Sequence, residues 1–128
     1  MSTAALLKQS MCYRSTPEHV QSFIGRFIYI YSDKGELTLT DTTLEFVGKN
    51  GLQVEIGLDS IVDVSVGRYS RWAKPYGLDY IAVRYQNDGT ERTALLTPTQ
   101  SWATSTWETN KIVAEWVTAL QAARSRHA

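Results

Sequence analysis

The chain has 128 residues, enough for one domain with a sizeable core. Its 13 basic and 13 acidic residues balance, which argues against a partner such as duplex nucleic acid. The single cysteine, Cys12, excludes an internal disulfide and favours a reducing, cytoplasmic setting. The apolar run Ala4–Leu7 is too short for a signal-peptide core or a membrane span, so we expect no transmembrane segment.

The chain begins with residues 1–15, which we expect to form a flexible arm. We expect one domain to follow over residues 16–126. Thr16-Pro17-Glu18 is a helix-start signal, because a hydroxyl cap precedes a proline and an acidic residue. It predicts a short helix over Pro17–Ile24, which Gly25 can end.

Arg26–Tyr31 is predicted to be the first strand. Every position after Arg26 is apolar, so alternation does not assign the two faces of this strand. We expect one face to lie in the core and the other to be covered by the N-terminal helix or by a partner chain.

A long alternation of apolar residues runs from Gly35 to Gly67. A period of two is typical of strands with one face on a core. Asn50-Gly51 supplies residues that tolerate positive φ in a tight hairpin turn. The pattern predicts four antiparallel strands: Glu36–Thr40, Thr43–Gly48, Leu52–Leu58 and Ile61–Gly67.

The alternation stops over Arg68–Asp79 and then resumes. Tyr80–Gln86 and Thr90–Thr97 are predicted to form the last two of seven strands. Further on, Ser105 and Glu108 have the spacing of a capping box, and Asn110 is a second candidate cap. They predict a helix that ends at about Arg124 and has one apolar face: Ile112, Val113, Trp116, Val117 and Leu120.

Three segments of the meander carry a family resemblance: Gly35-Glu-Leu-Thr-Leu-Thr40, Leu44-Glu-Phe-Val47 and Ile56-Gly-Leu-Asp-Ser-Ile61-Val-Asp-Val64. This pattern resembles the opening of a GRAM-type or bacterial pleckstrin-homology-like (PH-like) domain, and the resemblance covers about Arg26 to Arg124. It implies a mainly β fold with one C-terminal α-helix. The expected architecture is a PH-like, partly open barrel of seven antiparallel strands, capped by the helix. The resemblance carries no catalytic residue.

Residues suited to catalysis are few and scattered. His19 and His127 lack metal-ligand spacing with Cys12 or with a carboxylate, so surface histidines are the favoured interpretation. Asp59 and Asp63 lie near a turn, where aspartate is common for conformational reasons. An incidental cysteine is likewise favoured over a reactive thiolate, because no base is near it in the sequence. We therefore expect no enzyme, no cofactor and no metal site.

The segment that joins the fifth and sixth strands, residues 68–80, is the most basic loop of the chain. It mixes cations with aromatic residues: Arg68, Tyr69, Arg71, Trp72, Lys74 and Tyr76. Such a loop can bind an anionic membrane surface, where the cations meet phosphate and the rings lie at the headgroups. It could equally stack single-stranded bases or pair with acidic groups on a protein. The simplest interpretation is a loop packed over the barrel mouth.

Two further tryptophans, Trp102 and Trp107, flank a polar run just before the C-terminal helix. One interpretation is that they plug the barrel end, because large aromatics dominate core energetics. The alternative is an aromatic groove or an oligomer contact, where tryptophan is enriched.

The first functional hypothesis is a non-catalytic binding or assembly module, with self-association or a protein partner. The second is peripheral binding of anionic lipid through the loop 68–80. The third is a small-molecule-binding barrel or an enzyme, for which no acid, base or nucleophile can be named.

Overall fold

The computed structural model describes residues 6–22, 31, 33–49, 51–69, 72, 77–101 and 105–127. In chain order its elements are β1 (Leu6–Ser15), α1 (Pro17–Gln21), β2 (Asp33–Thr40), β3 (Thr43–Gly48), β4 (Gln53–Gly57), the 3₁₀ turn η1 (Leu58–Ser60), β5 (Ile61–Arg68), β6 (Asp79–Asn87), β7 (Thr90–Thr99) and α3 (Thr106–His127).

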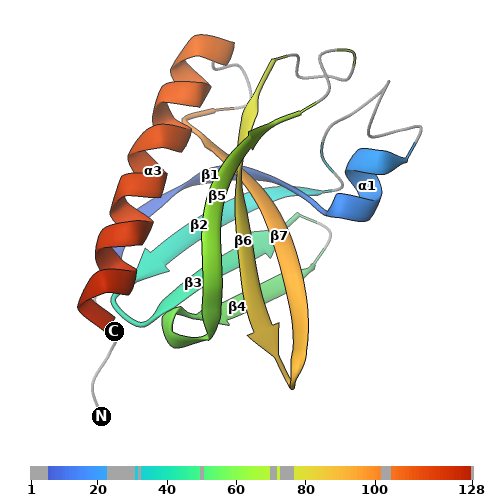
Figure 1. The fold of residues 1–128 in the computed structure, drawn as a ribbon. Coiled ribbons are helices and arrows are strands. Elements are labelled where there is room, and N and C mark those ends of the chain that lie inside the picture. The colour runs from blue at the N-terminus through green and yellow to red at the C-terminus, as the bar shows by residue number, and fades with distance from the viewer. Residues whose placement is uncertain are drawn as a thin grey trace.

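The seven strands form one antiparallel sheet in the order β4-β3-β2-β1-β7-β6-β5. The strands β1 to β4 pair in chain order, as do β5 to β7, and the contact of β1 with β7 joins these two halves of the sheet. The sheet bends until its halves face one another, while β4 and β5 remain its edges (Figure 1). The fold is therefore a PH-like, partly open seven-stranded barrel with one C-terminal helix, which confirms the predicted fold class.

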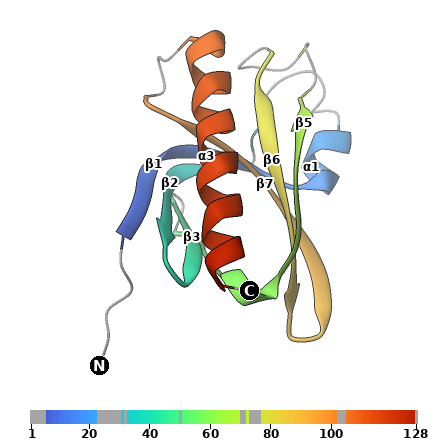
Figure 2. The same cartoon turned by 60° about the vertical axis from the view of Figure 1, so that its left-hand side comes forward.

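The helix α3 runs along the opening between the two halves of the sheet (Figure 2). The Ser105 hydroxyl accepts a hydrogen bond from the Glu108 amide at 3.2 Å, which confirms Ser105 as the cap. Val113, Trp116 and Leu120 are buried, as the helical spacing predicts. A helix with this apolar face closes the open side of a bent sheet.

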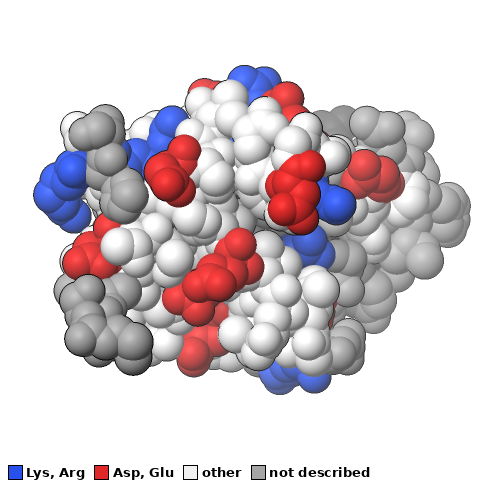
Figure 3. Space-filling view, turned by 90° about the horizontal axis from the view of Figure 1, so that it is seen from below, with Lys and Arg blue, Asp and Glu red and all other residues white. Residues whose placement is uncertain are grey.

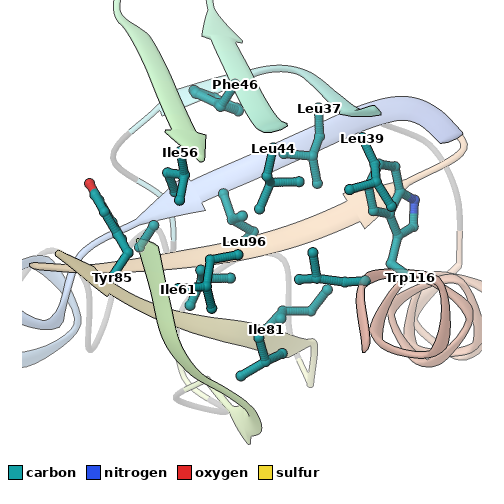
Figure 4. Packing of buried hydrophobic residues seen from close by; sticks show 14 of the residues in the cluster. Leu37, Leu39, Leu44, Phe46, Ile56, Ile61, Ile81, Tyr85, Leu96 and Trp116 are labelled. Atoms are coloured by element: carbon teal, nitrogen blue, oxygen red, sulfur yellow. The ribbon is translucent and has the colours of Figure 1, made fainter. Parts of the chain in front are cut away.

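The main core lies between the halves of the sheet and α3 (Figure 4). Leu37, Leu39 and Leu44 come from one half, and Ile81 and Leu96 come from the other. Trp116 is the largest fully buried side chain and has no exposed surface. The alternation read from the sequence therefore builds the core that holds α3 in place.

The expectation of a flexible arm over residues 1–15 is wrong for the part that the structure describes. Leu6–Ser15 is the central strand β1, paired with β2 on one side and with β7 on the other. The sequence did not predict this strand, because the polar residues Lys8, Gln9 and Ser10 break the alternation that marks a half-buried strand.

The predicted first strand, Arg26–Tyr31, lies outside the described residues except for Tyr31, which belongs to no strand. The described residues contain seven strands, and the first of them is β1. After β1, the described part of the chain continues into α1. Thr16 caps α1, since its hydroxyl accepts from the His19 amide at 3.1 Å.

Two valines of β5, Val62 and Val66, are more exposed than the alternation predicts. Val64 is buried, whereas Val62 is 45% exposed and Val66 is 54% exposed. The pairing of β5 with β6 shifts register between Ile61 and Asp63, and such a bulge redirects the side chains beside it. β5 is also an edge strand, so its outer residues have no neighbouring strand in the described structure.

Candidate functional site

The segment that joins β5 to β6 is closed at its base by two contacts. The Tyr69 amide donates to the Leu78 carbonyl at 3.0 Å. Arg68 Nε donates to Asp79 Oδ1 at 2.9 Å, and the Arg68 side chain stays 69% exposed. Because an exposed ion pair contributes at most about 1 kcal/mol, this contact orients Arg68 more than it stabilises the fold.

Tyr69, a candidate binding residue, is part of a second core cluster instead. It is 3% exposed and packs with Tyr13, Leu78 and Leu95 on the outer face of the sheet. Its ring lies 4.8 Å from the ring of Tyr80, measured between centroids. Burial raises the pKa of the Tyr69 phenol. Tyr69 therefore anchors the start of the loop and is not available to a ligand.

Trp72 is the third of the six loop candidates that the structure describes, after Arg68 and Tyr69, and it is 61% exposed. The remaining candidates of the loop, Arg71, Lys74 and Tyr76, lie outside the described residues. An exposed tryptophan is unusual, because its large apolar surface favours burial. Trp72 is thus not part of the core in this structure.

The start of α3 presents a second exposed tryptophan. Trp107 is 69% exposed, and the Lys111 ammonium lies over its ring, 5.6 Å from the ring centroid. Trp107 therefore does not plug the barrel end. Trp102 lies outside the described residues.

Asn110 holds these two segments at the same end of the molecule. Its side-chain oxygen accepts from the Asp79 amide at 2.8 Å, and its side-chain nitrogen donates to the Gly77 carbonyl at 3.1 Å. Asn110 is thus a bridge inside α3 and not the cap that the sequence suggested. Figures 1 and 2 both show the end of β5, the start of β6 and the start of α3 at one end of the fold. We call this surface, with Arg68, Trp72 and Trp107, the tryptophan end.

The opposite end of the molecule has a different surface. Figure 3 shows acidic side chains across the middle of that end, and no continuous basic patch among the described residues drawn there. Basic side chains are also visible on this end, so it carries charges of both signs.

The residues considered for catalysis do not gather into a site. Cys12 has no exposed surface, and burial raises the pKa of its thiol. Asp59 and Asp63 are exposed, one in η1 and one on β5. His19 belongs to the short helix α1, and of His127 only the backbone is described. Within the described ranges, no three His, Cys, Asp or Glu side chains are placed to bind a metal.

A pocket that the sequence did not indicate opens at the mouth of the barrel near α1. It has a volume of about 370 Å³ and is lined by residues such as Arg14, Thr16, Tyr85, Arg92 and Thr93. Arg14 comes from β1 and Arg92 from β7, and these two strands are paired. The sequence did not indicate this pocket, because the strand that carries Arg14 was not predicted.

No helix in the described parts of the chain has the length and apolarity needed to cross a membrane. No family model matches the sequence, and no curated protein is significantly similar to it. Among solved structures, the hSac2 domain from human phosphoinositide phosphatase Sac2 has a similar fold, with a TM-score of 0.66 and 10% sequence identity. The match covers 100% of this chain and 75% of that one. At this identity the likeness shows the fold alone.

Proposed function

We propose that the protein is a non-catalytic binding module that acts through its tryptophan end. The observation that carries the proposal is the exposure of two tryptophans, Trp72 at 61% and Trp107 at 69%, in two segments that Asn110 connects. Exposed aromatic side chains on one surface typically mark an interaction site. Kinship with GRAM-type and bacterial PH-like domains is part of the proposal and rests on the meander residues.

A second observation favours a particular partner, an anionic membrane surface. Lys111 lies over the Trp107 ring, and Arg68, Arg71 and Lys74 belong to the same loop as Trp72 in the sequence. Tryptophan rings favour the headgroup region, and each cation near an anionic leaflet contributes about 1 kcal/mol. The fold is also found in a domain of a phosphoinositide phosphatase, which is compatible with such a surface.

Vesicle co-sedimentation tests the membrane candidate. The intact protein is mixed with neutral or anionic vesicles, at low and at moderate salt. We expect anionic-selective, salt-sensitive binding, which an R68A/R71A/K74A variant weakens by about a hundredfold, the effect of three lost cations. A K49A/R92A/R126A variant changes the net charge equally at other exposed positions and should bind as the wild type does.

Assembly with further copies of the chain is the alternative use of the same surface. Light scattering over a range of concentrations distinguishes the two uses. A rise in mass that a W107A variant abolishes favours assembly. A strict monomer at high concentration that also binds anionic vesicles favours the membrane. A monomer that binds no vesicle of either kind contradicts both uses of the tryptophan end.

A further inference from the structure

The central strand β1 is paired on both sides for only half of its length. Its pairing with β2 extends from Leu6 to Arg14, but its pairing with β7 extends only from Met11 to Ser15. Along Leu6–Ser10 the side toward β7 has no strand partner among the described residues. An unpaired strand edge is a template for another extended chain.

The end of β7 is fixed in a way that keeps this edge open. β7 stops at Thr99, whose hydroxyl donates to the Ser101 carbonyl at 3.1 Å. The same hydroxyl lies 2.9 Å from the Thr109 hydroxyl of α3, and this contact is buried. These two hydrogen bonds of Thr99 hold the end of β7, and the second connects it to α3. Figure 2 shows the first half of β1 running away from the end of β7, beside α3.

The gap between these elements is a notch of about 290 Å³. Lys8, Gln9 and Ser10 line one side, and Thr99 and Gln100 form its end. The facing side of α3 contributes further residues: Glu108, Lys111, Ile112, Glu115 and Trp116. The notch therefore lies between a strand edge and a helix, as an inserted strand requires.

The charges around the notch have both signs, and their contacts in the described residues are not with opposite charges. Lys8 and Lys111 are basic, while Glu108 and Glu115 are acidic. None of the four forms an ion pair with another described residue. These side chains can pair with a ligand that carries both signs.

Trp116 lines the notch and leaves a hydrogen-bond donor unused. Its side chain is fully buried, and its indole N–H has no hydrogen-bond partner among the described residues. In Figure 4 the indole nitrogen lies on the side of the ring that faces away from Leu37 and Leu44. The Lys8 ammonium stands over the ring, 5.8 Å from its centroid. An unpaired buried donor is costly, and a carbonyl oxygen supplied from outside would satisfy it.

We propose that this notch is a strand-acceptor site for a short extended segment of a partner polypeptide. The segment pairs with the free edge of Leu6–Ser10 where β7 has ended, and one of its carbonyls accepts from the Trp116 indole. Its acidic side chains lie near Lys8 and Lys111, and its basic ones near Glu108 and Glu115. Main-chain bonds give such a complex its affinity, and alternating side chains give it specificity. This inference rests on the proposed binding role but not on the tryptophan end.

The test uses a panel of blocked hexapeptides in which Glu and Lys alternate with Val or Thr in different orders. Binding to the isotopically labelled full chain is followed by NMR, at the amides of Leu6–Ser10 and at the Trp116 indole N–H. We expect these signals to shift together for a subset of the panel. The same peptides methylated at their backbone nitrogens should not bind, because they cannot donate to a strand edge.

Two variants test the roles of the Trp116 and Lys8 side chains in peptide binding. Trp116→Phe keeps an aromatic ring in the core and removes the N–H, and it should weaken the best peptide by about fivefold, the effect of one hydrogen bond. Lys8→Glu should shift the preference toward peptides with the reversed charge order by about threefold, while Arg92→Glu, far from the notch, should not.

The proposal is overturned if no peptide shifts the Leu6–Ser10 amides, if the shifts lie elsewhere, or if the methylated peptides bind equally well. A W72A/W107A variant separates this result from the proposed function. It should lose vesicle binding and still bind the peptide. Vesicle binding without peptide binding would leave the tryptophan end intact as a site and remove the notch.

Discussion

Two tryptophans on the same helix have opposite environments. Trp116 has no exposed surface and contacts the main core, whereas Trp107, near the start of α3, is 69% exposed. Burial of a large aromatic ring stabilises a fold, and exposure of one does not. The comparison separates the face of α3 that holds the barrel together from the tryptophan end, which is exposed at the surface.

The largest expected effect is a loss of stability when the buried Trp116 is replaced. Trp116→Ala should lower the free energy of unfolding by about 3–5 kcal/mol, because it leaves a cavity beneath α3. Trp107→Ala should change it by less than about 0.5 kcal/mol, since the site is exposed. Urea unfolding of both variants measures the difference. Equal losses would break the comparison, because Trp107 would then have a structural role.

A smaller loss of stability is expected when the Asn110 bridge between α3 and the β5–β6 segment is removed. Asn110→Ala removes both hydrogen bonds from α3 to Gly77 and Asp79, and should cost about 1–3 kcal/mol. Thr118→Ala, on the exposed side of the same helix, serves as the control. Hydrogen exchange should show faster opening of the Tyr69 and Asp79 amides in the Asn110 variant alone. Unchanged exchange would mean that Asn110 does not hold the β5–β6 segment.

The burial of Cys12 should make the free energy of unfolding depend on pH. Its thiol has an ordinary pKa of 9.0, and burial raises this pKa in the folded protein. Above about pH 9 the unfolded chain therefore loses a proton that the folded chain keeps, so stability falls as the pH rises. The fall should be about 1.4 kcal/mol per pH unit for this group.

The matching measurement is the free energy of unfolding of the wild type and of Cys12→Ala between pH 8 and about pH 10. The variant should lack the part of the decline that begins near pH 9, while the tyrosines contribute to both proteins at higher pH. Parallel curves for the two proteins would contradict the burial of the Cys12 thiol.

Much of the fold could be predicted, because alternation and turn residues directly reflect a half-buried antiparallel sheet. Leu37, Leu44 and Ile56 lie in the core as their period of two required. Ser105 caps α3, as the capping-box spacing required. Both signals are local, so one sequence suffices to recognise them.

β1 could not be predicted in the same way. Cys12, Tyr13 and Ser15 are all buried, because the second half of this strand is covered on both faces, by the main core and by the tyrosine cluster. A strand covered on both faces shows no alternation, and the polar Lys8–Ser10 belongs to a half that lacks one neighbour. These conditions depend on distant parts of the chain.

The candidate site was predicted only in part. The sequence identified the loop 68–80 and Trp107, but it could not separate the buried Tyr69 from the exposed Trp72. It did not indicate that the loop and the start of α3 share one end, because this depends on the long-range bridge of Asn110. The notch beside β1 could not be predicted either, because the sequence did not predict β1.

The most direct test of the tryptophan end is the binding of anionic vesicles by a W72A/W107A variant. Its matched control is V47A/V66A, which shortens two exposed apolar side chains on other strands. We predict that the tryptophan variant binds at least about tenfold more weakly than the wild type, while the valine variant binds equally well. Wild-type affinity in the tryptophan variant would contradict the assignment of this end as the binding surface.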